Sequence, residues 1–527
     1  MSSQTAATPL LHLLQQQLEA ARQHNAAALL ASNQGTIIQV PGTGKTISSA
    51  YEQLRNAAEY TEEHLLLQRA IRRFFHRNLM LLGRKHQFPQ NLGEELIIEL
   101  TQAGYLHNSK FGTDIAATIA HKADESWTVY WQLHDAHIAR EEAMEWTLDA
   151  LSVETESMLN PHAQLDAIAY VGYTHYSRLL PKKILAANSA EEAQYESCLY
   201  IAVHQSLFKS DVASIRYDLT RMYHQTPHDL PAFIAFNRNL TTLYTSELTQ
   251  KLKRTISKYG APLRILKSLS DTHPNLPEIL HDRTEFLALY ERQVSKEYND
   301  LSKRLQKGLA KSIAFIFITK VIIGIGIEVP YDLIVVGSVS LLPLSINLLF
   351  PPLYMASLEV GLRTPSRNNA NALKDYIDRA LYSETTTQTV LKVSTKTASG
   401  FAKLLYGVAF FIPFAVTVYI LSLLHFNIVQ GIIFFAFLST ASFLGFRLAR
   451  MIRDLEIVTE QQSFVITLRD FFYLPFILVG QWISRKYAKV NAIAFILDMT
   501  IELPLKTILR LLRQWSRFLS EKHDEIY

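Results

Sequence analysis

The sequence has a single cysteine, Cys198, and is poor in glycine, proline and charge. One thiol cannot form a disulfide within the chain, which excludes a disulfide-stabilised scaffold. Glycine (19) and proline (18) together make up about 7% of the 527 residues, against roughly 12% in an average protein, so turns are few and helices are expected. Charged residues make up 19% and hydrophobic residues 48%. Such a composition excludes disorder throughout and predicts an apolar part fused to a soluble part.

The net charge of +4 conceals an asymmetry between two parts of the chain. Residues 1–308 carry 31 Lys and Arg against 33 Asp and Glu, and residues 309–527 carry 21 against 15. The basic excess therefore belongs to the apolar part. This favours contact with anionic lipid and argues against nucleic acid as a partner.

Two long apolar regions predict two membrane-spanning helical hairpins. Their four segments are residues 310–327, 333–350, 404–424 and 428–446. The shortest of these have 18 residues, just enough to cross a hydrocarbon core of about 30 Å. A polar turn from Glu328 to Asp332, with Pro330 inside it, is expected in the first hairpin, and an uncharged turn in the second. The alternative, two hairpins buried in a soluble core, leaves these lengths unexplained.

Basic residues flank the apolar segments on one side only. They precede the first segment, fill the loop 361–400 and follow the fourth segment, whereas neither hairpin turn contains Lys or Arg. This alternation satisfies the positive-inside rule, so we expect a multi-pass inner-membrane protein with both termini in the cytoplasm. Residues 1–35 lack the basic start and apolar run of a signal peptide, which agrees with an N-terminal part that stays on the side of synthesis.

The segment beyond the fourth apolar run has a different pattern. Residues 471–483 are apolar but too short to span, which suits a re-entrant or interfacial helix. Farther on, a Leu/Trp face opposes a basic face, as in a helix that lies on an anionic leaflet. The residues expected at this membrane surface are Lys506, Arg510, Arg513, Trp515 and Arg517. Docking of the same helix against the protein's own helices is the open alternative.

The N-terminal part, residues 47–308, has the periodicity of an all-α bundle. Long helices are expected at 48–81 and 128–159, and only residues 36–40 have the pattern of a strand. No glycine or proline follows Pro277 over the next 30 residues, so one continuous helix is expected to run from there into the first membrane segment. Such a stalk would couple the bundle mechanically to the hairpin. An ordinary bundle helix that ends at the bilayer is the alternative.

The string PGTGKT is similar to the end of a phosphate-binding loop. In such a loop, backbone amides and a lysine hold a phosphate at a helix N-terminus, which makes Gly42, Gly44, Lys45 and Thr46 candidate nucleotide-binding residues. Gln39 occupies the position of the motif's first glycine, and no later strand offers an aspartate for Mg²⁺. A turn that caps the next helix is therefore the favoured interpretation, with nucleotide binding as the alternative.

On the helix expected at 128–159, His134, His137 and Glu141 share one face at spacings that can hold a divalent metal. No matching pair marks a partner helix, so exposed polar positions are the favoured interpretation and a metal site the alternative. Cys198 lies in a helical run with no histidine placed to activate it, which predicts a buried, inert thiol. No cofactor is expected.

Lys320 lies near the middle of the first apolar segment, where a charge costs at least about 2.5 kcal/mol. We expect its side chain to face the interior of the helix bundle, with Glu328 and Asp332 as candidate partners. Two interpretations remain open: Lys320 lines a path for an ion or polar solute, or it forms a structural bond between helices.

Several motifs resemble a known family. The stretches RDFFYLP at 469–475, FILD at 495–498 and IELPLK at 501–506 are similar to the C-terminal signature of an uncharacterised family of polytopic membrane proteins from small-genome bacteria. The helix AYEQLRNAAEY at 50–60 is similar to their N-terminal part. The resemblance implies a bacterial inner-membrane protein with a cytoplasmic helical domain. It supplies no catalytic residues, because none are assigned to that family.

The sequence thus predicts an all-α fold with a cytoplasmic helical bundle, a transmembrane domain of two hairpins and C-terminal interfacial helices. The expected units are 1–46, 47–308, 309–358, 359–402, 403–450 and 451–527. The first hypothesis is a non-enzymatic scaffold or interaction protein, whose partners are anionic lipid, unknown proteins and further copies of the chain. The alternatives are a transporter or channel component with Lys320 near its path, and a nucleotide-binding membrane enzyme with a degenerate phosphate-binding loop.

Overall fold

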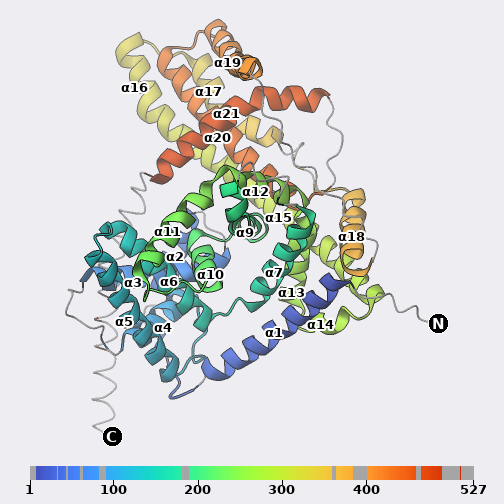
Figure 1. The fold of residues 1–527 in the computed structure, drawn as a ribbon. Helices are drawn as coiled ribbons and strands as arrows, with labels where there is room; N and C mark the ends of the chain where they lie inside the picture. Colours follow the sequence, from blue (N-terminus) through green and yellow to red (C-terminus); the bar gives the residue numbers. More distant parts are fainter. Residues whose placement is uncertain are drawn as a thin grey trace.

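A computed structural model describes residues 8–32, 34–42, 45–59, 63–81, 89, 91–180, 182, 189–358, 362, 364–383, 400–457 and 464–489, together with positions 508, 511 and 515. This part of the chain is all-helical, as the sequence predicts (Figure 1). The strand expected at 36–40 does not form: the segment is extended, and its one bridge joins Ile37 antiparallel to Gly112. A lone bridge makes no sheet, so helix packing determines the architecture.

The chain forms an N-terminal bundle and a second group of helices joined to it by one long rod. The N-terminal bundle comprises α1 (Pro9–Ser32), α2 (Lys45–Glu59), η1 (Glu63–Leu65), α3 (Leu66–Leu81), α4 (Leu92–Ala103), α5 (Thr113–Asp135), α6 (Arg140–Leu159), α7 (Ala163–Leu179), α9 (Ser189–Val203), η2 (His204–Phe208), α10 (Val212–Met222), α11 (Leu230–Thr245), α12 (Glu247–Tyr259), α13 (Ala261–Thr272) and α14 (Leu276–Ile279). The rod consists of α15 (Arg283–Ile323), η3 (Gly324–Glu328), α16 (Val329–Tyr331) and η4 (Asp332–Val336). The remaining helices are α17 (Leu341–Ser357), α18 (Arg367–Tyr382), α19 (Gly400–Leu423), α20 (Ile428–Arg453) and α21 (Phe464–Lys489). The rod beyond residue 308 forms, with α17, α19, α20 and α21, the group at the top of Figure 1, which we call the apolar bundle.

Two hydrophobic cores stabilise the N-terminal bundle. The first joins α3, α4, α5 and α6 around buried side chains such as Phe75, Ile119 and Leu151. The second joins α1, α7, α9, α10, α12, α13 and the first turns of α15 around Tyr176 and Tyr290. Each large apolar side chain that leaves water in this way contributes roughly 1.5–3 kcal/mol. The amphipathic spacing of the sequence therefore corresponds to buried helix faces.

Helix α18, which lies between the two predicted hairpins, packs back onto the N-terminal bundle. Its apolar face places Leu373 and Ile377 in the second core. At its first turn, Asn369 Nδ2 donates to the Tyr298 hydroxyl on α15 at 2.7 Å, and Asn369 Oδ1 accepts from the Ile457 N–H at 2.8 Å. Helix α18 and the chain just after α20 are thereby fixed against the same bundle.

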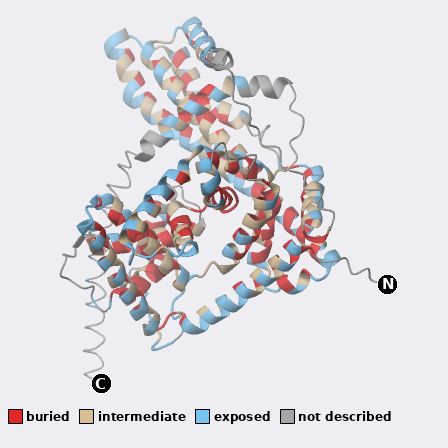
Figure 2. Cartoon of the chain, viewed as in Figure 1, coloured by how far each residue is buried: buried red, intermediate tan, exposed pale blue. Residues whose placement is uncertain are grey.

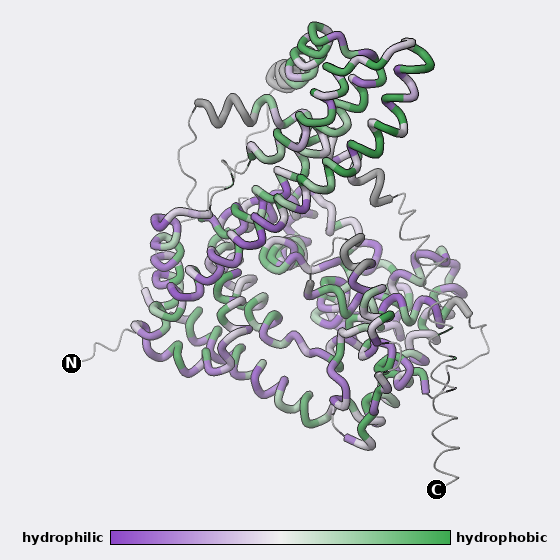
Figure 3. Tube along the Cα trace, turned by 180° about the vertical axis from the view of Figure 1, so that it is seen from behind, coloured by the Kyte–Doolittle hydropathy of each residue, from purple (hydrophilic) through white to green (hydrophobic). Residues whose placement is uncertain are grey.

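The apolar bundle is hydrophobic on its outside and buries several polar side chains among the apolar ones of its interior. Among the described residues, 31 of the 37 large hydrophobic side chains that are exposed lie from Phe315 onward. Figure 3 shows this group of helices as predominantly hydrophobic, and Figure 2 shows much of its outer surface as exposed. Its buried positions include Lys320, Glu328, Asp332 and Asn347. Since exposed apolar surface costs roughly 25 cal/mol per Å² in water, this polarity is opposite to that of a water-soluble bundle.

Two helices in the described residues are long and apolar enough to cross a membrane. They are the rod Arg283–Val335 and helix Ile428–Arg453. Three shorter apolar helices accompany them: Leu341–Ser357, Phe410–Leu423 and Phe471–Ser484. All five contribute to the apolar bundle.

The turn predicted for the first hairpin is wrong, whereas the second lies where expected. Residues 328–332 continue the helix, and the chain reverses after Gly337, whose φ of +81° glycine adopts readily. Pro330 lacks the N–H that a regular α-helical ladder would use, and the wider π-helical register of η3 and η4 accommodates it. The second turn ends at Asn427, whose side chain caps α20.

The long helices expected at 48–81 and 128–159 are each divided. The first becomes α2 and α3, with η1 between them. The second breaks between α5 and α6, where His137 has a left-handed φ of +59° that no α-helix accepts. These breaks let α5 and α6 pack against each other around the first core instead of extending as one rod.

The stalk helix and the C-terminal apolar helix differ from their predicted limits. α15 begins at Arg283 rather than at Pro277, because Asp282 caps it by accepting from the next N–H groups. The short helix expected at 471–483 is the middle of the 26-residue α21. α21 packs closely on α20, where a side chain at Gly480 would meet the Ser439 carbonyl oxygen at 2.1 Å. Its re-entrant or interfacial placement stays a prediction; within the protein this helix packs against α20.

Candidate functional site

A buried polar cluster lies inside the apolar bundle. Lys320 Nζ donates to Glu328 Oε1 at 2.7 Å, and neither side chain is more than 1% exposed. The ammonium also lies 4.7 Å from the ring centre of Phe437 on α20, within the range of a cation–π contact. The sequence predicts an inward-facing Lys320 with Glu328 or Asp332 as its partner, and the structure pairs it with Glu328.

Asp332 joins the two hairpins instead. Its carboxylate accepts from Asn427 Nδ2 at 2.7 Å and from Gln430 Nε2 at 2.9 Å, both at the N-terminus of α20, where a negative charge is favourable. Asn347 Nδ2 on α17 donates to the Gln430 carbonyl oxygen at 3.3 Å. The sequence does not single out these three amide residues. The signal that could have found them is a polar side chain within or beside an apolar run.

Two buried oxygen atoms of this cluster have no hydrogen-bond partner among the described residues. They are Glu328 Oε2 and Asn347 Oδ1. A buried acceptor without a donor is costly, so each of these two oxygens leaves the cluster open to one further hydrogen-bond donor. The cluster can therefore bind a further polar group at these atoms, or lock the hairpins together.

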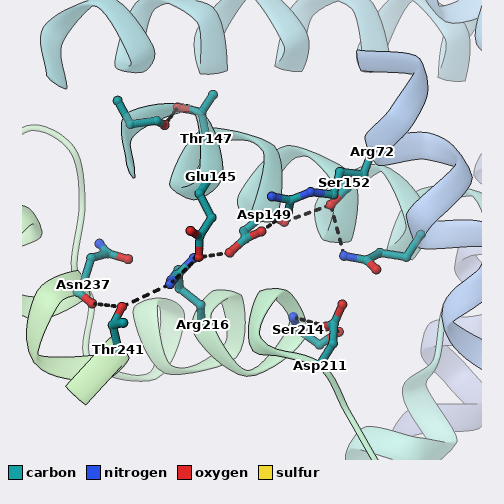
Figure 4. Close-up of polar contacts among 12 residues, drawn as sticks. Arg72, Glu145, Thr147, Asp149, Ser152, Asp211, Ser214, Arg216, Asn237 and Thr241 are labelled. Atoms are coloured by element: carbon teal, nitrogen blue, oxygen red, sulfur yellow. Dashed lines mark hydrogen bonds and ion pairs between the residues drawn. The ribbon is translucent and has the colours of Figure 1, made fainter. Parts of the chain in front are cut away.

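A second buried charge cluster lies where the two cores of the N-terminal bundle meet (Figure 4). Asp149 on α6 forms ion pairs with Arg72 on α3 and with Arg216 on α10. Arg216 also pairs with Glu145 at 3.2 Å and donates to Thr241 on α11 at 3.3 Å. Burial lowers the pKa of the Arg216 guanidinium, and Glu145 opposes this shift. Because the cluster links helices of the first core to α10 of the second, its geometry is that of a structural cross-link.

Two carboxylates on α7 and α10, Asp166 and Asp218, interact electrostatically. Burial and, after it, the negative charge of Asp166 raise the pKa of Asp218 to about 7, although the Tyr200 hydroxyl, at 3.3 Å, and Arg221 oppose the shift. Burial also raises the pKa of Asp166. The folded state therefore keeps a proton on Asp218 that the unfolded state releases above about pH 4.

We expect the free energy of unfolding to fall as the pH rises from about 4 to about 7, by up to about 1.4 kcal/mol per pH unit for one such group, and to level off above that range. Asp218→Asn should reduce the slope, because an amide does not titrate. The measurement is thermal unfolding of the full chain in detergent across this pH range. Identical slopes for the two proteins would contradict the role assigned to Asp218.

The PGTGKT string does not adopt the setting of a phosphate-binding loop. Gly42 is exposed, with no atom within 4 Å of a side chain placed there, and Lys45 and Thr46 are the exposed first residues of α2. Gly44 lies outside the described residues. The parallel sheet that such a loop requires is absent from the part of the chain in view, so the nucleotide-binding hypothesis loses its structural basis. The Lys45 N–H bonds to the Gly42 carbonyl at 3.1 Å, as in a capping turn.

The metal site, which was the alternative to exposed polar positions, loses its basis because His134, His137 and Glu141 do not share one helix face. His134 ends α5, His137 lies in the left-handed break and Glu141 belongs to the first turn of α6. No group of three His, Cys, Asp or Glu side chains among the described residues could hold a metal ion. Cys198 is 1% exposed, and burial raises the pKa of its thiol, which agrees with the predicted inert thiol.

Of the residues predicted at the membrane surface, only Trp515 is described. It is 63% exposed, and Ile508 and Leu511 on the same predicted face are also exposed. The basic partners Lys506, Arg510, Arg513 and Arg517 lie outside the described residues. The amphipathic surface helix therefore stays a prediction.

The fold and its polar cluster define an all-helical protein in which two helices are long and apolar enough to cross a membrane. No family model matches the chain, and no curated protein or solved structure was found to match it. The family resemblance thus depends on its motifs alone, and the function is argued from residues.

Proposed function

We propose that the chain is an integral protein of the cytoplasmic membrane, in which the rod, α17, α19 and α20 cross the bilayer as two hairpins and α21 packs beside them. The observation that carries this proposal is the inverted polarity of the apolar bundle, with hydrophobic side chains outside and the Lys320–Glu328 pair inside. Lipid tails favour that arrangement, because they solvate apolar side chains and offer no hydrogen bond to polar ones.

The N-terminal bundle and the segments that follow α17 and α20 would lie on the same side of this membrane. Two contacts support that orientation besides the docking of α18. Arg264 on α13 donates to the Asp454 carbonyl oxygen at 2.5 Å, and Lys209 pairs with the Asp454 carboxylate at 3.2 Å, just after α20. The basic residues at these ends favour the cytoplasmic side.

Within this architecture, a non-enzymatic scaffold or interaction function is the best supported. The N-terminal bundle presents an aromatic surface on α7, α10 and α11, where Tyr170, Met222 and Tyr223 are 45%, 46% and 39% exposed and Phe236 lies 5.8 Å from the Tyr223 ring. Tyrosine, methionine and phenylalanine are enriched in protein interfaces. A bundle fixed to the membrane by the rod and α18 would hold this surface, and a protein bound to it, near the bilayer.

A photocrosslinking amino acid placed at Tyr170 or Met222 tests this function in intact cells. We expect a discrete crosslinked product at both positions, because a bound partner would cover them. Leu30 on α1 is the matched control, since it is 74% exposed and lies outside the aromatic surface. Absence of a product at Tyr170 and Met222, or the same product at Leu30, would contradict the proposal.

Transport of protons or ions is the second candidate, and the unpartnered Glu328 oxygen beside Lys320 is the observation that favours it. In that case Lys320→Met should abolish flux in proteoliposomes while the protein still inserts into the membrane. Flux that persists in this variant, or wild-type protein that shows none above empty vesicles, would remove this candidate.

A further inference from the structure

A cavity of about 250 Å³ lies where the N-terminal bundle meets the apolar bundle. It is bounded by α13, the end of η2, α15 and the end of α20. The charged side chains of its wall are Lys209, Arg264, Lys267, Arg304, Glu297 and Asp454. Four cations against two carboxylates leave an excess of positive charge in the wall of this cavity.

The two carboxylates do not neutralise this excess. Asp454 already pairs with Lys209, and Glu297 accepts from the Gln293 side chain at 3.1 Å. Arg304, which is exposed, forms no ion pair within the described part of the chain. Lys267 pairs at 2.6 Å with Asp271, which lies outside the cavity wall, and its side chain is 31% exposed. Both can turn toward an anion in the cavity.

Repulsion between cations strengthens the case for an anion. The Arg264 guanidinium is fixed by the Ser206 carbonyl oxygen at 2.7 Å. Burial lowers the pKa of Arg264, and Arg450 at the end of α20 adds to this effect, although Asp454 opposes it. A bound anion would relieve both the desolvation and the repulsion.

The cavity also lies at the level where a lipid headgroup would be found. Arg304 precedes Ala310, the start of the first apolar segment, by six residues, or about 9 Å of helix. Met451 lies five residues beyond Phe446, the end of the fourth segment. Basic pockets at this depth on the cytoplasmic side bind anionic headgroups in membrane proteins.

We propose that this cavity binds the phosphate group of an anionic phospholipid from the cytoplasmic leaflet. Lys209, Lys267 and Arg304 supply charged donors, and Arg264 supplies fixed positive charge behind them. The lipid tails would then follow the exposed apolar faces of the rod and α20. That the phosphate belongs to a lipid follows only if the protein lies in the membrane as proposed above. A free phosphate offers the same charged oxygens and could bind without that placement.

Native mass spectrometry of the full chain in a nonionic detergent tests the proposal. The probes are phosphatidylglycerol, phosphatidylcholine and inorganic phosphate. We expect one phosphatidylglycerol per chain, held at least about tenfold more tightly than phosphatidylcholine, and a loss of about tenfold or more in the variant Arg304→Gln with Lys267→Gln. Lys303→Gln is the matched control, because Lys303 carries the same charge on α15 but lines a different groove.

The possible results support or overturn different parts of the proposal. Equal binding of the two lipids, or the same loss in Lys303→Gln as in the double variant, overturns the proposal. Binding of inorganic phosphate that depends on Arg304 and Lys267, without a preference for phosphatidylglycerol, keeps the phosphate site and overturns the lipid source. Release of the full chain from membranes by alkaline carbonate would instead contradict the proposed membrane placement.

Discussion

Asp149→Asn should lower the free energy of unfolding of the N-terminal bundle by about 3–5 kcal/mol, the cost of leaving buried charge without its partner. Asp149 is the carboxylate that both Arg72 and Arg216 contact, and its side chain is 4% exposed. Its loss leaves the buried Arg216 with Glu145 alone. For a unit of this size, we expect the midpoint of thermal unfolding to fall by roughly 6–20 °C.

Cys198 provides the measurement. It is the only cysteine and is 1% exposed, so a thiol-reactive fluorogenic dye will report unfolding of the second core in the full chain. Glu145→Gln is the matched control: it removes the same charge from the same cluster, but Glu145 is 52% exposed, and we expect a loss below about 1 kcal/mol. Equal effects of the two substitutions would contradict the account of this cluster.

Breaking the Lys320–Glu328 pair should destabilise the apolar bundle by about 3–5 kcal/mol from either side, whereas the double variant Lys320→Leu with Glu328→Leu should recover most of the loss. Both side chains are at most 1% exposed. Each single substitution therefore leaves the other side chain buried without its opposite charge, or forces that side chain to become neutral. Two leucines remove both buried charges and leave apolar side chains in their place.

The stability of the wild type, the two single variants and the double variant is compared by heating each full-length protein and measuring the folded fraction that remains by size-exclusion chromatography. Lys311→Leu is the control, because Lys311 is exposed at the edge of the segment and should change stability little. Single variants as stable as the wild type would show that the pair does not hold the bundle together. A double variant that is stable but has lost ion flux would favour the transport candidate over the scaffold.

The helical class and the two apolar hairpins could be predicted because periodicity and apolar length are local properties of the sequence. The second turn was placed correctly since its polar residues bound two uninterrupted apolar runs. The first turn was misplaced because Pro330, Glu328 and Asp332 together form a strong local turn signal. In the fold, Lys320 pairs with Glu328 Oε1 and the side-chain amides of Asn427 and Gln430 bind Asp332, so both carboxylates have partners inside the protein and the helix continues.

The candidate site could be predicted only in part, because local sequence patterns do not show which distant residues will pack together. A lysine in an apolar run must find a polar partner, which predicts the burial of Lys320. The distant partners of Asp332, Asn427 and Gln430, follow from tertiary packing and have no local pattern. Likewise, the spacing of His134, His137 and Glu141 fits a helix face, and nothing local shows that His137 is left-handed. The docking of α18 depends on a core that α1, α13, α15 and other helices build, and could not be inferred from its own sequence.

Labelling of single cysteines in spheroplasts tests the central claim, the membrane topology, most directly. In a Cys198→Ala background, the account predicts that an impermeant maleimide labels Ser338→Cys, in the turn of the first hairpin, without permeabilisation. Ser366→Cys, beside α18, and Glu247→Cys, on the N-terminal bundle, should be labelled only after the membrane is opened. All three positions are exposed, so access depends on the side of the membrane. Labelling of Ser366→Cys in sealed spheroplasts, or protection of Ser338→Cys, would contradict the account.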